Sequence, residues 1–85
     1  MDDLGYLMFN VAKWLSYDDG QYIRKKYHVP DVWSEPEAPL IFMRVTQVIS
    51  EDNVDALIQC LQELGRGDLV DRCVVPYQKR QGLIQ

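Results

Sequence analysis

Few residues of this chain have a type and spacing that would support bond chemistry. The sequence contains one histidine, His28, and two cysteines, Cys60 and Cys73. No glycine-rich phosphate loop, HExxH motif or GxSxG motif accompanies them. Two thiols are too few for a disulfide framework or a four-thiolate metal site, and no base is placed beside either. We therefore expect a protein that is not an enzyme and has no metal or other cofactor, with both cysteines reduced in the core.

The charged residues offer a different chemistry, the recognition of other charged groups. Arg24, Lys25 and Lys26 are consecutive cations, and the segment Arg66-Gly67-Asp68-Leu69 places an arginine two residues before an aspartate. A guanidinium is a planar fork that can bond carboxylates on two sides. The same segment contains the RGD tripeptide of integrin ligands, but that use requires a secreted protein and nothing in the sequence indicates secretion.

Length and net charge limit the classes of protein to which the chain can belong. The 85 residues suffice for one domain, and 13 acidic against 9 basic residues give a net charge of −4. A free-standing nucleic-acid binder usually carries the opposite sign, because phosphate contacts dominate its affinity. There is no run of about 18 apolar residues that could cross a membrane, and the N-terminus lacks the basic segment of a secretory signal. We expect a cytoplasmic or nuclear protein with neither a membrane nor a nucleic-acid partner.

Apolar residues at helical spacing predict the elements that position these charged groups. The predicted helices cover about residues 2–15, 17–27, 38–48, 51–64 and 67–75. Ser16, with Asp19 three residues later, predicts a capping box for the second helix, and Ser50 predicts an N-cap for the fourth. Gly65 is expected to close the fourth helix, and Pro76 to end the last one.

The proline content predicts an irregular stretch between the second and third helices. Residues 29–39 carry three of the four prolines, so this stretch can hold at most a short turn of helix. Pro39 fits the first turn of the helix that follows. Residues 79–85 are polar and are expected to form a loose tail, which leaves residues 1–78 as the domain. Together the elements predict an all-α bundle of five or six short helices.

The second and last helices carry residues that resemble the death effector domain family, whose members are six-helix domains of the death-fold superfamily. That family has an RxDL motif at the start of its last helix, matched here by Arg66, Asp68 and Leu69, and an acidic residue early in its second helix, matched by Asp19. The order of the helices is similar over about residues 3–78. The resemblance implies a six-helix antiparallel bundle with the proline-rich loop in place of a long third helix. It also implies a charge triad of Asp19, Arg66 and Asp68 between the second and last helices, with Leu69 in the core.

The resemblance further implies a non-enzymatic module that binds other death effector domains, in adaptors and caspase prodomains, and regulates caspase activation and apoptotic signalling. The family often exposes an apolar patch on its first two helices, where this chain has Lys25 and Lys26. We therefore expect an electrostatic contact with Arg24, Lys25 and Lys26 as its basic face. Head-to-tail contacts of this kind between copies of one chain lead to self-association and, if they do not close, to a filament.

Three other interpretations stay open on the sequence alone. A death domain or caspase-recruitment domain, acting in inflammatory or innate immune signalling, would pair with a different class of partner, but the placement of RxDL disfavours it. A helix-turn-helix protein would use Arg24, Lys25 and Lys26 on nucleic-acid phosphates, against the acidic balance of the chain. A stand-alone enzyme would need a site that the sequence does not contain in recognisable form.

Overall fold

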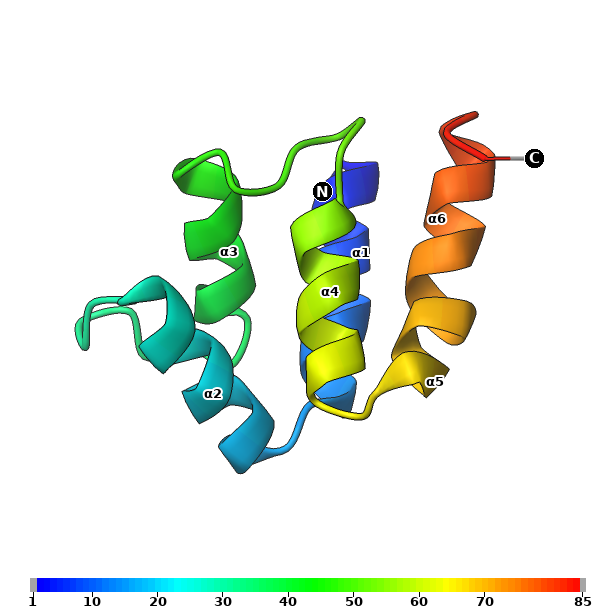
Figure 1. The fold of residues 1–85 in the computed structure, drawn as a ribbon. Coiled ribbons are helices and arrows are strands. Elements are labelled where there is room, and N and C mark those ends of the chain that lie inside the picture. The colour runs from blue at the N-terminus through cyan, green and yellow to red at the C-terminus, as the bar shows by residue number, and fades with distance from the viewer. Residues whose placement is uncertain (1, 85) are drawn as a thin grey trace.

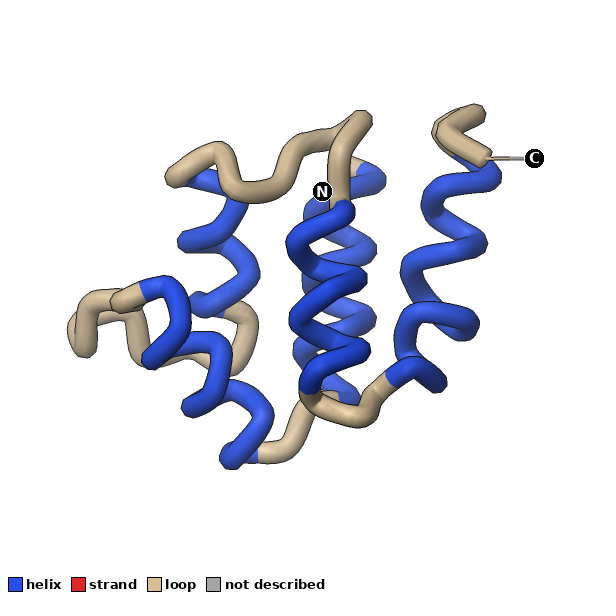
Figure 2. Tube along the Cα trace, in the orientation of Figure 1, coloured by secondary structure: helices blue, strands red, loops and turns tan. Residues whose placement is uncertain are grey.

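The computed structural model describes residues 2–84. All the secondary-structure elements within them are helices, as the sequence predicts (Figure 1). The elements are α1 (Asp3–Trp14), α2 (Tyr17–Tyr27), α3 (Ala38–Val45), α4 (Asp55–Glu63), α5 (Gly67–Leu69), a π-helical turn (Val70–Val74) and α6 (Val75–Arg80). The last three follow one another without a break, so residues 2–84 form five helical segments (Figure 2). In Figure 1, α2 and α3 lie on one side of α1 and α4, and the last segment lies on the other. None of these helices is long and apolar enough to cross a membrane.

The expected count of six helices is wrong for the described residues, because no helix forms between α2 and α3. Residues 28–37 contain only turns and bends, which confirms the predicted irregular loop. Pro30 and Pro36 cannot donate a backbone hydrogen bond, and each disfavours the helical conformation of the residue before it. The ring of Trp33 meets that of Phe42 edge-on, with 5.4 Å between centroids, and so holds the loop against α3.

The starts of the first two helices follow from local side-chain chemistry. The Asp2 carboxylate caps α1 by accepting the Gly5 N–H at 2.8 Å. At the start of α2 the Ser16 hydroxyl accepts the Asp19 N–H, and the Asp19 carboxylate accepts the Ser16 N–H, both at 3.1 Å. This is the predicted capping box, which satisfies two backbone donors that a helix N-terminus otherwise leaves unpaired.

The prediction that Ser50 is the N-cap of the fourth helix is wrong. Its hydroxyl donates to the Asp52 carboxylate at 2.9 Å, and its backbone pairs with that of Asn53 in an isolated bridge. The Asn53 carboxamide oxygen instead accepts the N–H of Asp55, at 3.1 Å, where α4 begins. Residues 51–54 therefore form a turn rather than the first turn of a helix. The third helix is also shorter than expected, since it ends at Val45.

The prediction that Pro76 ends the last helix is wrong as well. Pro76 lies in the first turn of α6, directly after the π-helical turn. In that turn the Val75 N–H bonds to the Val70 carbonyl, five residues back instead of four. A proline inside an α-helix lacks a donor and its ring collides with the carbonyl four residues before it. The wider π turn relieves this conflict, so the helix continues to Arg80.

Residues 79–84 are more ordered than the expected loose tail. Lys79 and Arg80 belong to α6, the side-chain amide of Gln81 donates to the Asp3 carboxylate at 2.8 Å, and Leu83 packs against the core. Gln85, the last residue of the expected tail, lies outside the described residues. The expected boundary after residue 78 therefore falls inside a helix.

A single core joins all five helical segments. Its fully buried members include Leu4, Leu7, Val11, Ile23, Leu40, Met43, Leu57, Leu61, Leu69, Val74 and Tyr77. Helices of this length are marginal in isolation, so packing on this core is what stabilises them. Polar bonds at the edge of the core add order: the buried Tyr77 hydroxyl donates to the Glu51 carbonyl at 2.6 Å. Cys60 is buried, as predicted for a core thiol, and Cys73 is half-buried.

The N-terminus of α1 is tied to the C-terminal end of α3 by Asp2 and Arg44. The Arg44 guanidinium donates to both carboxylate oxygens of Asp2, at 3.0 Å from Nη1 to Oδ1. The bonds from Arg44 hold the pKa of Asp2 well below its usual range, and the bond from the Gly5 N–H adds a smaller effect in the same direction.

We predict that Arg44→Gln makes the fold less sensitive to acid. A carboxyl group whose pKa is lowered by folding stabilises the protein above its unfolded pKa, about 3.9, and loses this contribution as the pH falls toward its folded pKa. The free energy of unfolding, measured with urea at pH 7 and pH 3, should fall less in the variant than in the natural chain. Lys25→Gln, which removes an exposed cation that has no ion pair among residues 2–84, should leave the pH dependence unchanged. If the free energy of unfolding falls as much in Arg44→Gln as in the natural chain, the bond between Arg44 and Asp2 is not the source of the acid sensitivity.

We predict that Gly65→Ala destabilises the fold by about 1 kcal/mol, because Gly65 has a left-handed φ of 72° that disfavours any side chain. Gly67→Ala is the matched control. Gly67 has an ordinary φ, and a methyl group there would meet no atom within 4 Å, so its substitution should be neutral or slightly stabilising. Chemical denaturation of the two variants measures the difference; equal effects would contradict it.

Candidate functional site

The connection between α4 and α5 fixes the backbone of Arg66 on both sides. Gly65 closes α4 in the left-handed conformation, as predicted, and the Arg66 N–H then bonds to the Leu61 carbonyl at 2.7 Å. The Arg66 carbonyl accepts the Leu69 N–H at 3.0 Å, which starts α5. Leu69 is fully buried and so anchors the last position of the RxDL motif in the core. The side chain of Arg66 extends from the first position.

The Arg66 guanidinium brings together the three residues of the expected charge triad. Its Nη1 donates to the Asp19 carboxylate at 3.0 Å, and its Nε donates to the Asp68 carboxylate at 3.2 Å. The same Nη1 also donates to the backbone carbonyl of Trp14 at 3.0 Å. One side chain therefore connects the end of α1, the first turn of α2 and the start of α5.

The bond to the Trp14 carbonyl is a part of the site that the sequence analysis missed. The last carbonyls of a helix have no partner within it, so an acceptor at the end of α1 could be foreseen, but not the cation that reaches it. Trp14 is 47% exposed. Lys13 and Arg72 lie over its ring at 5.7 and 5.3 Å from the ring centre, which adds two cation–π contacts beside the triad.

The three charges of the triad differ in their exposure to water. The side chains of Asp19, Arg66 and Asp68 are 16%, 26% and 53% exposed. The hydrogen bond to Asp68, and after it the bond to Asp19, raises the pKa of Arg66, while the bond from Arg66 lowers the pKa of Asp68. The bond to Asp19 is the less hydrated of the two and is the one that spans two helices. It is therefore the stronger candidate for stabilising the arrangement.

The three consecutive cations of α2 do not form one basic face, contrary to expectation. Lys26 forms an ion pair with Glu63 of α4. Arg24 points to another side of the helix, where its Nη2 donates to the Glu35 carbonyl at 3.3 Å. Lys25 is exposed and has no ion pair among the described residues. Lys25 is thus the one member of the trio whose charge is wholly available to a partner.

Glu63 is a second residue that the sequence analysis missed. Its carboxylate accepts from Lys26 and, at 3.1 Å, from the Tyr22 hydroxyl, so two side chains of α2 converge on one group of α4. These bonds, that of Lys26 first, lower the pKa of Glu63. The partners are 37 and 41 residues apart along the chain, and no local pattern links them.

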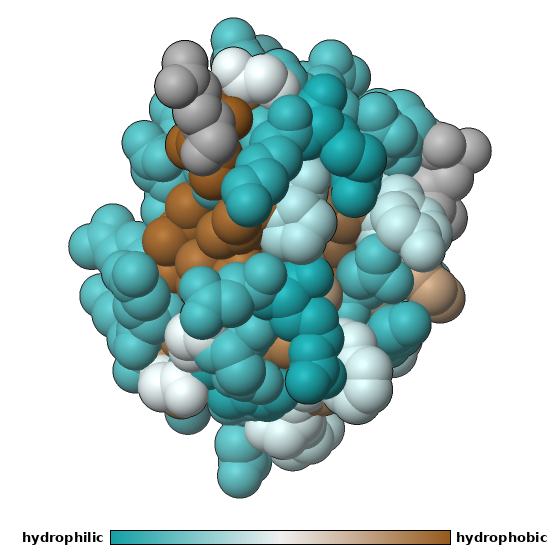
Figure 3. All heavy atoms as spheres, turned by 90° about the vertical axis from the view of Figure 1, so that its right-hand side faces the viewer, coloured by the Kyte–Doolittle hydropathy of each residue, from teal (hydrophilic) through white to brown (hydrophobic). Residues whose placement is uncertain are grey.

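The face that carries the last helical segment also shows apolar surface. Figure 3 shows a band of hydrophobic atoms there, bordered by hydrophilic residues. Val70 and Cys73 of this segment, and Leu83 beyond its end, are partly buried and pack against the core, and Ile84 is 39% exposed. Because Val70, Cys73 and Leu83 already pack against buried residues, we interpret this apolar surface as the margin of the core.

We predict that a double-mutant cycle assigns most of the stabilisation in the triad to Arg66 and Asp19. Pairing Arg66→Gln with Asp19→Asn should give a coupling free energy of about 1 kcal/mol, since the bond is largely shielded from water. Pairing Arg66→Gln with Asp68→Asn should give a smaller value, since Asp68 is half exposed. Both cycles are measured by chemical denaturation. A larger coupling for Asp68, or none for either pair, would contradict the prediction.

Comparison with known proteins identifies no relative. No family model matches the chain, no curated protein matches its sequence, and no solved structure matches its fold. The basis for a functional proposal is therefore the geometry of Arg66 and its partners, the distribution of charge over α2, and the sequence resemblance.

Proposed function

We propose that this chain is a non-enzymatic interaction module of the death effector type, which binds other domains of that type and so regulates caspase activation. The observation that carries the proposal is the meeting of Asp19, Arg66 and Asp68 around one guanidinium. The resemblance to death effector domains implies this charge triad between the second helix and the last. It requires an acidic residue early in one helix and an RxDL motif early in another to come together from 47 residues apart.

In this proposal the five helical segments correspond to a death-fold bundle in which the loop over residues 28–37 stands in place of the third helix. The triad holds the first turn of α2 against the start of α5, and α2 then presents its outer surface to a partner. The function is surface complementarity alone, with adaptors and caspase prodomains as the partners that the resemblance suggests.

Lys25 is the residue on which we base the contact. Arg24 and Lys26 are engaged with the Glu35 carbonyl and with Glu63, whereas Lys25 is exposed on the same helix without an ion pair among residues 2–84. A carboxylate of the partner could pair with it at little desolvation cost, which favours specificity and rate of association more than affinity.

The experiment compares Lys25→Glu with Lys79→Glu. Both residues are exposed lysines, so both changes shift the net charge equally, but Lys79 lies on α6, away from the proposed contact. We expect Lys25→Glu to abolish capture of death effector domains in a pull-down and to lower self-association in light scattering. Lys79→Glu should leave both unchanged, and neither variant should change the free energy of unfolding by more than about 0.5 kcal/mol.

Two results would count against the proposal. If the two variants behave alike, Lys25 is not at the contact. If the natural chain captures no death effector domain and remains monomeric, the proposed function itself is wrong.

A further inference from the structure

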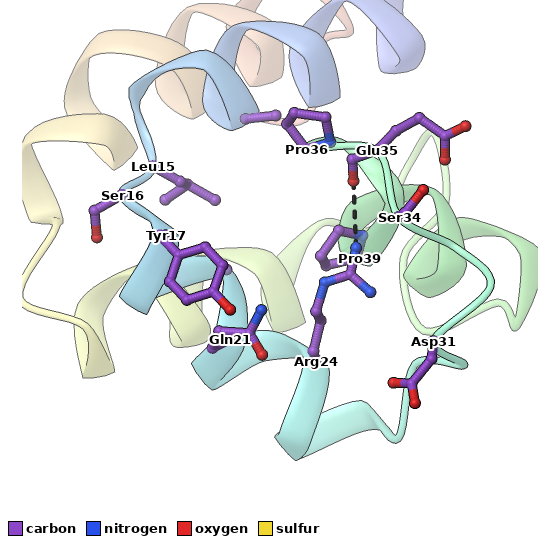
Figure 4. A pocket seen from close by; sticks show the side chains of 12 residues that line it. Leu15, Ser16, Tyr17, Gln21, Arg24, Asp31, Ser34, Glu35, Pro36 and Pro39 are labelled. Atoms are coloured by element: carbon purple, nitrogen blue, oxygen red, sulfur yellow. Dashed lines mark hydrogen bonds between the residues drawn. The ribbon is translucent and has the colours of Figure 1, made fainter.

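A groove separates α2 from the loop that follows it (Figure 4). Its volume is about 620 Å³, within the usual range for sites that hold a ligand. Tyr17, Gln21 and Arg24 line it from α2, since a spacing of four and then three residues puts them on one face of the helix. Ser34 and Pro36 of the loop line the opposite side.

Apolar residues and a glycine also line the groove. Leu15 and Pro39 are among its lining residues, and so is Gly20 of α2. Gly20 has an ordinary helical φ, and a methyl group added to it would meet nothing within 4 Å. Glycine is the least favourable residue of a helix interior apart from proline. Neither the backbone nor a close contact requires it here, and the space beside it is open to a ligand in the groove.

Arg24 gives one end of the groove a positive charge with a weak partner. Its guanidinium reaches across to the loop and donates to the Glu35 carbonyl at 3.3 Å, a long bond to a neutral acceptor. No carboxylate lies within ion-pair distance of it among the described residues. Figure 4 shows that the carboxylate of Glu35 itself is directed away from the groove. A carboxylate entering the groove would form a stronger, charge-assisted bond with Arg24.

Along the axis of α2, Gly20 and Arg24 are spaced about as far apart as alternate residues of an extended peptide. Gly20 and Arg24 are four residues apart on one helix, about 6 Å along its axis. In an extended chain, residues two apart point to the same side and are about 6.6 Å apart. Tyr17, Gln21 and Ser34 supply polar groups between and around these two points, where the backbone of a peptide would run.

We propose that this groove binds an extended segment of a partner protein in which an apolar side chain and an aspartate or glutamate are separated by one residue. The apolar side chain occupies the space over Gly20, and the carboxylate bonds Arg24. A nucleic acid is a poorer occupant, because it would bring several phosphates to a groove whose lining offers one cation, Arg24, on a chain with a net charge of −4. The inference goes beyond the proposed function, since it concerns a linear segment and does not involve Lys25.

The test uses the full chain and two fluorescein-labelled probes, the peptide Gly-Ser-Leu-Ala-Glu-Ser-Gly and the same peptide with Gln in place of Glu. By fluorescence anisotropy, we expect the Glu probe to bind at least about tenfold more tightly than the Gln probe. Arg24→Gln should remove this preference. Lys25→Gln, a neighbouring cation outside the groove, should preserve it.

Gly20→Leu tests the apolar half of the site. It should weaken binding of both probes at least about tenfold while the midpoint of thermal unfolding stays the same or rises, because leucine is the better helix former. Equal affinity for the two probes, binding of neither, or an equal effect of the Arg24 and Lys25 changes would overturn the proposal. So would a dodecamer of deoxythymidylate that displaces the Glu probe, or self-association that is lost in Gly20→Leu while the probes do not bind.

Discussion

The guanidinium of Arg66 bonds to groups that lie 52 and 47 residues before it in the chain, the Trp14 carbonyl and the Asp19 carboxylate. The oxygen of Asp19 that it reaches, Oδ2, is also the one that accepts the Ser16 N–H in the capping box. A single atom therefore both begins α2 and attaches it to the start of α5. Because the turn between α1 and α2 is short, the same side chain sets where α1 ends and the direction in which α2 leaves it.

This attachment determines which neighbours the side chains on each face of α2 contact. Successive residues of a helix are about 100° apart around its axis, so three consecutive cations cannot share a face. With the first turn of α2 held by Arg66, Lys26 meets Glu63 of α4, Arg24 meets the loop, and Lys25 is left in solvent. The basic cluster of the sequence is thus divided among a structural ion pair, one wall of a groove and one free charge.

The parts of the fold that depend on local chemistry could be predicted from the sequence. The capping box at Ser16, the positive φ of Gly65 and the bodies of the helices need only neighbouring residues. The predictions at Ser50 and Pro76 were wrong because neither residue type fixes the local structure alone. A serine before a helical pattern need not be the N-cap, and a proline can lie in the first turn of a helix as well as after its end. The Asn53 side chain, and not that of Ser50, accepts the first N–H of α4, and a π turn lets the last helix pass through Pro76. The bonds of Glu63 across long stretches of chain follow no local pattern, and the bond between Asp19 and Arg66 was expected only from the resemblance.

The helix that carries both proposed contacts is also the one least held by the core. Ile23 is the single buried side chain of α2, whereas α1 of similar length buries five. Polar bonds from Asp19, Arg24 and Lys26 do the rest. Those of Arg24 and Lys26 are exposed, and exposed bonds contribute little each. Elements that bind partners are commonly drawn from the less stable parts of a fold, because they must adjust on contact. The triad holds the first turn of α2, and the later turns are held by Ile23 and by surface bonds to Glu63 and the loop.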